Sequence, residues 1–283
     1  MDSLTWDEFD ATLLSLDSKI IHQIWFGTYP TRQSAAKIRE ELNKYEKTWI
    51  NRNPDWLHVV WDTRRCRELI RLCYPQHQPL YEGYRWDIQR CDAARYFFLH
   101  RYGGLYSDMD YVCHKPWTEV VVEYPHKLYL VETPNKMSSA LHVSNSLMFS
   151  SVQKHTFWSR LFIEMERCKK VPVYYSRHME IMYTTGPGIL NKTFNVYERV
   201  DKLCSYPAKL FHPYGITSEN LDLGRAVGYY AVHLGKGSWE GKDSKIALFV
   251  YLHWRILVFI ILVMSLPWLV RWIVLRTVVA EES

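Results

Sequence analysis

The sequence lacks the cysteine and histidine patterns that mark small metal-binding modules. It contains six cysteines, but no two are spaced as Cys-x-x-Cys, and no histidine cluster completes a zinc-binding pattern. Small buried residues are the expected role of most of these cysteines, and their even number does not prove disulfides. A structural zinc site is therefore not predicted.

Two further absences concern partners and targeting. No run of Lys and Arg with interleaved aromatic residues occurs, so nucleic acid is a poor choice of partner. The formal net charge of +5 instead suits phosphate-bearing ligands or an anionic membrane surface. Residues 1–18 carry five acidic residues and no basic start or apolar run, which predicts an amphipathic helix rather than a signal peptide.

The middle of the chain alternates between strand and helix patterns. Of the 283 residues 48% are hydrophobic, which is enough for one large folded domain or two small ones. Residues 20–26 and 56–61 are typical of buried strands, and helical patterns follow at 31–53 and 62–74, before a polar, loop-like stretch at 75–83. This alternation predicts an α/β layer architecture with a largely parallel sheet.

The most informative stretch runs from residue 92 to residue 110. It begins inside a predicted helix, 86–101, which is rich in alanine and aromatic residues. Gly103 and Gly104 follow, and glycine readily adopts the left-handed conformation that ends a helix. A short strand is then expected to begin at Leu105.

Two carboxylates stand at the end of that strand. In an extended segment, the spacing of Asp108 and Asp110 points both side chains to the same face. Such carboxylates repel each other unless a divalent cation such as Mg²⁺ or Mn²⁺ binds between them. Asp92 and Arg95 lie one helical turn apart and can point to the same end, so the group suits a diphosphate. An Asp-x-Asp pair alone is more typical of a solvated surface turn.

The whole stretch resembles the signature of glycosyltransferases that use a nucleotide-sugar donor. Asp-x-x-Arg, an aromatic helix, Gly-Gly, an aromatic residue and Asp-x-Asp occur in this order. The resemblance is to the initiating α-mannosyltransferases and especially to the inositol phosphorylceramide mannosyltransferases, and it covers roughly residues 19–245. It implies a GT-A type, Rossmann-like catalytic domain with a mostly parallel sheet. It also implies GDP-mannose as donor, Mn²⁺ or Mg²⁺ as cofactor, inositol phosphorylceramide as acceptor and retention of the anomeric configuration.

The resemblance also implies roles for the residues at the centre of the motif. Asp108 and Asp110 would bind the metal and the diphosphate. Arg95 would neutralise phosphate or sugar charge, and Asp92 would hold donor hydroxyls. Trp25, at the end of the first strand, would stack on the nucleotide base, although a tryptophan in this position can also belong to the core.

Four residues further along the chain complete the expected site. By the resemblance, Asn145 lies beside the sugar, although the residues alone equally predict a polar turn before a strand. His233 is the expected third metal ligand, since a neutral imidazole suits Mn²⁺, although a single histidine is more often structural. Ser238 is expected to contact metal or phosphate, and Trp239 to cover the site.

The C-terminal stretch differs in kind. Residues 246–270 are apolar except for His253 and Arg255, and a membrane-spanning helix needs roughly 20 apolar residues. We therefore expect a membrane-spanning or membrane-associated helix over 246–276, followed by a short tail at 277–283. A helix lying in the interface is the alternative. The expected location is the Golgi or another endomembrane.

Two other functions remain open at this point. The first is a glycosyltransferase that uses a UDP-sugar and acts on a glycan or a protein. The second is a non-catalytic, membrane-tethered relative that binds lipid or sugar. The sequence does not reveal the acceptor, the linkage or a regulatory partner subunit. The glycosylation sequon at Asn191 is usable only if this domain is lumenal.

Overall fold

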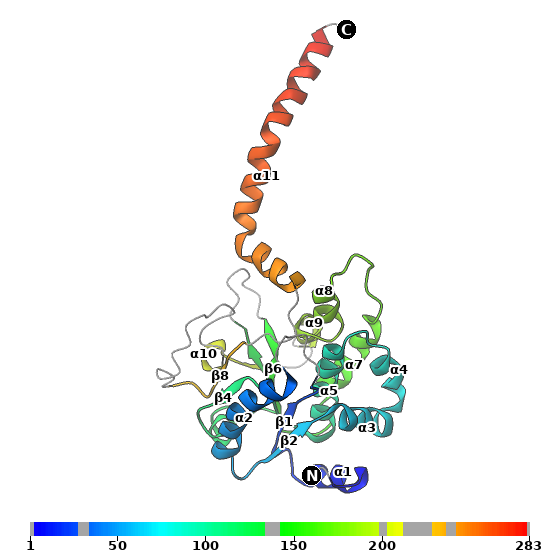
Figure 1. The fold of residues 1–283 in the computed structure, drawn as a ribbon, viewed down its shortest axis with the longest axis vertical. Coiled ribbons are helices and arrows are strands. Elements are labelled where there is room, and N and C mark those ends of the chain that lie inside the picture. Colours follow the sequence, from blue (N-terminus) through cyan, green and yellow to red (C-terminus); the bar gives the residue numbers. More distant parts are fainter. Residues whose placement is uncertain are drawn as a thin grey trace. The chain divides into compact units, whose positions relative to one another are not determined.

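A computed structural model describes residues 3–27, 34–133, 142–197, 203–211, 228–235 and 242–281. The chain divides into two compact units, Met1–Trp239 and Glu240–Ser283. The first unit contains the sheets and the carboxylate motif (Figure 1). Ser238 and Trp239, both expected at the site, lie outside the described residues.

A mixed six-stranded sheet forms the centre of the first unit, in the order β2-β1-β3-β6-β5-β7. Strand β1 is parallel to β2 and β3, and β5 is parallel to β7, whereas β6 is antiparallel to β3 and β5. The α/β class is confirmed, but the sheet is less parallel than expected. The strands are β1 (Ile20–Ile24), β2 (Leu57–Trp61), β3 (Gly104–Ser107), β5 (Leu128–Glu132), β6 (Val143–Ser150) and β7 (Cys204–Tyr206).

Connection lengths explain the antiparallel strand. A parallel neighbour requires a crossover of about a dozen residues or more, usually with a helix, whereas an antiparallel neighbour needs only a turn. Residues 133–142 alone separate β5 from β6, which is too short for such a crossover. Strand β6 therefore returns directly beside β5 and also pairs with β3, where Leu147 lies opposite Ser107.

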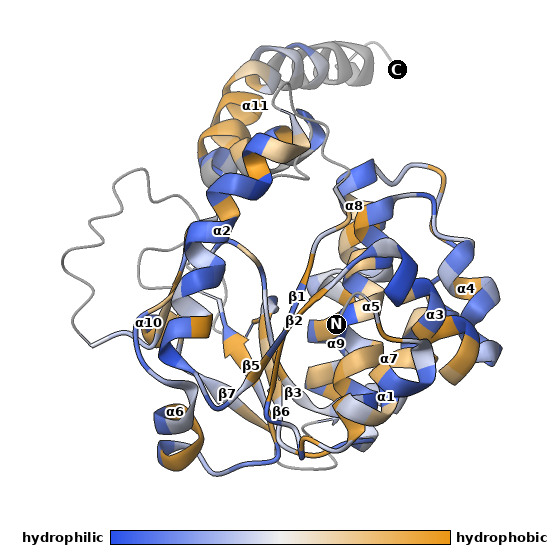
Figure 2. Ribbon diagram, turned by 60° about the horizontal axis from the view of Figure 1, so that its bottom comes forward, coloured by the Kyte–Doolittle hydropathy of each residue, from blue (hydrophilic) through white to orange (hydrophobic). Residues whose placement is uncertain are grey.

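Helices cover both faces of this sheet (Figure 2). The helices expected near 31–53, 62–74 and 86–101 are present, with boundaries that differ by a few residues. The loop expected at 75–83 is wrong, because Pro75 and Pro79 stand at positions where proline favours the start of a helix. The helices are α1 (Trp6–Leu14), α2 (Ala35–Arg52), α3 (Thr63–Cys73), a 3-10 turn (Pro75–His77), α4 (Gln78–Glu82), α5 (Asp87–Tyr102), α6 (Trp117–Glu123), α7 (Thr156–Arg167), α8 (Arg177–Thr184), α9 (Pro187–Tyr197) and α10 (Ala208–Phe211).

Side chains alternate between two hydrophobic clusters along the central strands. Ile20 and Tyr106 belong to one cluster, whereas their neighbours Ile21 and Leu105 belong to the other. Because successive strand residues point to opposite faces, the two clusters are the two sides of one sheet. The first packs against α1, α3, α5, α7 and α9, and the second against α2, α6 and α10.

The glycine pair after α5 is required by close packing. Gly103 has φ +68° and Gly104 has φ +89°, a region that side-chain-bearing residues rarely adopt. A Cβ atom on Gly103 would lie 2.2 Å from Ser18 Oγ, and one on Gly104 would lie 2.5 Å from Ile20 O. The helix ends at this pair as expected, and the chain passes directly into β3.

The second unit contains one long helix, α11 (Lys242–Glu281). It includes the helix expected at 246–276, with Pro267 in its interior. Among the residues that the structure describes, no helix is both long enough and apolar enough to cross a membrane.

His22 is a buried histidine of β1 that holds the sheet to the end of α5. Its ring lies 4.6 Å from that of Phe98 in a stacked arrangement, with Nε2 2.9 Å from Gly103 O. Trp61 Nε1 donates to His22 Nδ1 over 3.0 Å, which fixes the neutral tautomer with its proton on Nε2. Burial lowers the pKa of His22 to about 3, because the charged ring has no water around it.

This burial predicts a loss of stability in acid. The folded-state pKa lies below the unfolded value near 6.5, so the contribution of His22 is complete above pH 6.5 and falls as the pH drops toward 3. The free energy of unfolding can be measured by urea titration at several pH values between 5 and 8. Below pH 6.5 it should fall with decreasing pH by up to about 1.4 kcal/mol per pH unit more in the wild-type protein than in His22→Gln. Equal slopes in the two proteins would contradict this role for His22.

Candidate active site

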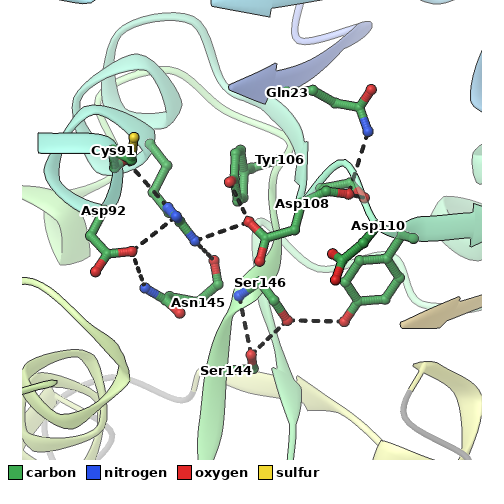
Figure 3. Close-up of polar contacts among 12 residues, drawn as sticks. Gln23, Cys91, Asp92, Tyr106, Asp108, Asp110, Ser144, Asn145 and Ser146 are labelled. Atoms are coloured by element: carbon green, nitrogen blue, oxygen red, sulfur yellow. Dashed lines mark hydrogen bonds and ion pairs between the residues drawn. The ribbon is translucent and has the colours of Figure 1, made fainter. Parts of the chain in front are cut away.

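The two carboxylates lie in a turn that follows β3. Tyr111 N donates to Asp108 O over 3.3 Å, and Asp108 N donates to Ser146 O of β6 over 2.8 Å. The expectation of an extended segment is therefore wrong, because the chain turns back after Ser107 to begin β4 (Tyr111–Cys113). Asp108 and Asp110 nevertheless come together, since the turn brings them toward one point (Figure 3).

His233 completes this group from a distant part of the chain. Strand β8 (Ala231–His233) pairs with β4 so that His233 lies opposite Tyr111, and the two rings stack at 4.5 Å. Leu234 N donates to Asp110 O over 2.9 Å, and His233 Nε2 lies 3.2 Å from Asp110 Oδ1. One ligand atom from each of Asp108, Asp110 and His233 lies within 4.8 Å of the other two.

The donor atoms of this group suit a divalent cation. The side chains of Asp108, Asp110 and His233 are 29%, 15% and 22% exposed, so the group is sheltered but still accessible to solvent. Two carboxylate oxygens and one imidazole nitrogen form a ligand set that Mn²⁺ accepts. The residues present therefore fit the metal that the sequence suggested.

Charges within the group shift the pKa values of both the carboxylate and the imidazole ligands. Loss of water raises the pKa of Asp108, repulsion from Asp110 adds to the shift, and Arg95 opposes it. Burial alone would lower the pKa of His233, but the adjacent Asp110 carboxylate raises it above its usual value. A cation would therefore compete with a proton for the His233 ring.

Arg95 joins the carboxylate turn to α5. One guanidinium nitrogen lies 2.9 Å from Asp92 Oδ1, and the other lies 3.2 Å from Asp108 Oδ1 and 2.7 Å from Asn145 O. Its guanidinium also lies 4.5 Å from the centroid of the Tyr106 ring. Burial alone would lower the pKa of Arg95, but Tyr106 and the two carboxylates raise it, so the side chain stays cationic.

Asp92 is a buried carboxylate with three donors around it. Besides Arg95, Asn145 Nδ2 donates to its Oδ1 over 3.0 Å (Figure 3). Thr185 Oγ1 donates to its Oδ2 over 3.4 Å. Burial raises the pKa of Asp92 to about 7, although Arg95 and these hydrogen bonds oppose the shift. The alternative of a polar turn at Asn145 is wrong, because this residue lies inside the buried strand β6.

Trp25 stands at the same edge of the sheet as Asp108. It directly follows β1, and the parallel register that pairs His22 with Tyr106 brings the ends of β1 and β3 together. Gln23 Nε2 confirms the proximity by donating to Asp108 O over 3.4 Å. Trp25 is partly exposed, with the Arg39 guanidinium 5.9 Å from its ring, so it is not a core residue.

Two residues that contact the site were missed by sequence reasoning. Tyr106 OH donates to Asp108 Oδ1, and Thr185 reaches Asp92 from the segment between α8 and α9. Tyr106 stands inside the motif as its aromatic residue, so its place beside Asp108 was the available signal. The only sequence signal at Thr185 was the pattern Thr-Gly-Pro-Gly. This pattern indicates a turn and the start of a helix, not a contact with Asp92.

The amide of the glycosylation sequon is used inside the fold. Asn191 Oδ1 accepts from Val143 N over 2.7 Å, and its Nδ2 donates to Val143 O over 2.8 Å and to Pro187 O over 2.7 Å. The side chain thus ties the start of α9 to the first residue of β6, two residues before Asn145. In the folded chain this amide is a structural anchor.

The ligand group predicts how variants change metal affinity. His233→Gln and Asp110→Asn should each weaken Mn²⁺ binding by about tenfold or more, because each removes one strong donor. Asp87→Asn, which changes an exposed carboxylate on α5, is the matched control and should leave the affinity unchanged. Titration of Mn²⁺ followed by electron paramagnetic resonance measures all three. Wild-type affinity in both site variants would show that the ion binds elsewhere.

Comparisons with known proteins agree with the motif. Residues 39–127 match the family described as a glycosyltransferase sugar-binding region containing a DXD motif. The chain is 26% identical over 242 residues to inositol phosphoceramide mannosyltransferase 3 of Schizosaccharomyces pombe, covering 86% of this chain and 61% of that protein. It is 31% identical over 181 residues to mannosyl phosphorylinositol ceramide synthase SUR1 of Saccharomyces cerevisiae, covering 64% of this chain and 42% of that protein.

The chain thus spans about three fifths or less of the length of these curated relatives. Among solved structures, the PaToxG glycosyltransferase aligns with a TM-score of 0.43 and 14% identity, covering 68% of this chain and 76% of that one. Residues 39–127 therefore match the DXD-containing glycosyltransferase sugar-binding regions, and the chain is similar to the inositol phosphoceramide mannosyltransferases.

Proposed function

We propose that this protein is a metal-dependent glycosyltransferase that moves mannose from GDP-mannose to inositol phosphorylceramide with retention of configuration. One observation carries the proposal: Asp108, Asp110 and His233 converge directly beside the buried pair of Arg95 and Asp92. The names of the relatives support transfer of mannose to this lipid, and the motif supports a nucleotide-sugar donor. The GT-A type of fold is part of the same proposal.

Charge is the main contribution of the site to this reaction. When bound, a divalent cation supplies positive charge against the leaving diphosphate. Asp108, Asp110 and His233 would hold the cation, and their partial exposure leaves it accessible to phosphate oxygens. Arg95 stays cationic at the same turn and adds a second positive charge close to the bond that breaks.

Asp92 and Asn145 would orient the sugar. A carboxylate offers about four lone-pair positions, so Asp92 can accept a sugar hydroxyl while Arg95, Asn145 and Thr185 still contact it. Trp25, partly exposed at the end of β1, offers a flat surface on which the base of the donor stacks. Together these contacts place the anomeric carbon between the carboxylate turn and the acceptor.

Removal of the acceptor proton is assigned to the donor itself. Asp92, Asp108 and Asp110 each contact a basic partner, Arg95 or His233, and none is an isolated base. We therefore assign the proton to the oxygen of the departing phosphate, with the acceptor entering on the face from which that phosphate leaves. This arrangement yields retention of configuration.

A membrane location follows from the proposed acceptor. Inositol phosphorylceramide is a bilayer lipid, and the described part of α11 exposes large apolar side chains such as Ile261 and Met264. We propose that α11 associates with a membrane of the Golgi or another endomembrane system.

A donor panel tests the proposal. The full chain is incubated with inositol phosphorylceramide and either GDP-mannose or UDP-galactose, with Mn²⁺ or with a chelator, and the lipid product is identified by mass spectrometry. We expect product only from GDP-mannose with Mn²⁺. Product formed only from the UDP-sugar would show that GDP-mannose is not the donor. Full turnover with the chelator would show that the reaction does not need a metal.

A variant pair tests the carboxylate turn in the same assay. Asp108→Ala should lower turnover by about 10³-fold or more, because it removes a ligand and the partner of Arg95. Asp87→Ala, on the exposed side of α5, is the control and should retain full activity. Circular dichroism checks that both variants fold. Normal turnover in a folded Asp108→Ala protein would contradict the assigned role.

A further inference from the structure

The connection between α7 and α8, residues 168–176, exposes apolar side chains at its tip. Val173 is 104% exposed and Tyr174 is 78% exposed, and Pro172 beside them is also exposed. Figure 1 shows this connection extending beyond α8 within the first unit. A projecting tip of this kind makes no contribution to the core of the unit.

The connection has a defined conformation. Tyr175 N donates to Pro172 O over 3.0 Å, so Val173 and Tyr174 are the two central residues of a tight turn. Tyr175 packs against the ring of Tyr183 at 5.8 Å, which anchors the base of the turn on α8. Ser176 Oγ then accepts from Met179 N and caps that helix. The turn therefore presents its two apolar residues outward on a fixed base.

Charges around the tip are mainly positive. Residues 167–177 include four basic residues and no acidic ones. Lys169 contacts Glu166 at 3.0 Å, and the Arg177 guanidinium lies 4.9 Å from the ring of Trp86. Arg167, at the start of this stretch, contacts Glu164 at 2.9 Å. Arg85 lies over the same Trp86 ring, and Glu180 accepts from Trp86 Nε1. The balance remains cationic.

We propose that this connection is a membrane-docking turn that inserts Val173 and Tyr174 into the interface of an anionic bilayer. Tyrosine is enriched at the interface between lipid and water because its ring is apolar and its hydroxyl is polar. Lysine and arginine beside it are attracted to anionic headgroups while their aliphatic stems remain on apolar surface. The sequence Lys-Lys-Val-Pro-Val-Tyr-Tyr places both features on one short turn.

A bilayer fits this surface better than a protein partner. A stable protein interface needs roughly 800 Å² on each side, and its centre is depleted in lysine. Two apolar residues on a projecting turn with lysines beside them offer neither the area nor that composition. They do match the shallow insertion by which peripheral proteins bind the headgroup region.

The docking turn is connected to the site through α8. This helix leads from the turn to Thr185, whose hydroxyl contacts Asp92. Membrane contact at residues 173 and 174 would therefore orient the sugar pocket relative to the surface in which the proposed acceptor lies. That consequence rests on the proposed function, whereas the membrane contact itself does not.

Hydrogen exchange of the full chain tests the contact directly. Exchange of peptides covering 168–176 is followed alone, with phosphatidylcholine vesicles, and with vesicles that also contain phosphatidylserine. We expect exchange in this segment to slow by about fivefold or more with the anionic vesicles and less with the neutral ones. Because the readout is the turn itself, binding of the chain through α11 does not count as support.

Variants distinguish insertion of the docking turn from nonspecific binding of the protein to vesicles. Val173→Asp with Tyr174→Asp should abolish the protection of the turn. Val122→Asp changes a residue of α6 that is 75% exposed and should leave the protection of the turn unchanged. Lys170→Gln should raise the lipid concentration needed for half-maximal protection by about fivefold, the share of one cation near an anionic surface. Unchanged exchange of α5 peptides shows that each variant remains folded.

The outcomes that overturn the proposal are specific. If anionic vesicles slow exchange in α11 but not in residues 168–176, the docking turn does not bind the bilayer. Equal loss of the turn's protection in Val122→Asp would show an unspecific effect of added charge, and protection without vesicles would indicate self-association instead. Protection of the turn in a protein that fails the donor panel would leave the docking turn intact and refute only the proposed function.

Discussion

The buried contact of Arg95 with two carboxylates is the interaction on which the site depends. A guanidinium enclosed in this way is stable only while anions or carbonyl groups surround it, and loss of one partner typically costs about 3–5 kcal/mol. Arg95 meets Asp92 of its own helix, Asp108 of the turn after β3, and the backbone of Asn145 in β6. One side chain therefore fixes the position of three elements relative to one another.

The order of the strands explains why these three elements meet. Strand β6 is antiparallel and inserted between β3 and β5, so its residues 144–146 lie beside the end of β3. Asp108 N donates a hydrogen bond to Ser146 O, one position beyond Ser107 and Leu147, the last paired residues of the two strands. A sheet with only parallel neighbours would have brought a crossover connection to this edge instead of a polar strand. The mixed topology thus brings Asn145 to Asp92.

Local patterns predicted much of this arrangement, because their causes are local. The helix before Gly103, the steric need for two glycines, and the one-turn spacing of Asp92 and Arg95 depend only on neighbouring residues. The carboxylate pair itself was also visible, since charged residues after an apolar strand are rare in a core. The class of fold followed from the alternation of strand and helix.

The contacts that could not be predicted link residues far apart in the chain. Thr185 and Asn145 reach Asp92 across 93 and 53 positions, and no spacing rule connects such residues. His22 makes contacts of the same long-range kind. It lies in the core, where Trp61 and Gly103, 39 and 81 positions away, satisfy both ring nitrogens. Strand alternation separates it from Gln23, which points to the site edge and contacts Asp108 O.

The shared arginine also links the two halves of the site energetically. Asp108 raises the pKa of Asp92, and Arg95 lowers it. When Asp108 gives its charge to a bound cation, its repulsion on Asp92 falls, and the Asp92 carboxylate becomes easier to keep ionised. An ionised Asp92 is the better acceptor for a sugar hydroxyl, and a hydroxyl bound there favours the same ionised state. By linkage the two effects are reciprocal, so a cation at the carboxylate turn and a hydroxyl group at Asp92 should each favour binding of the other.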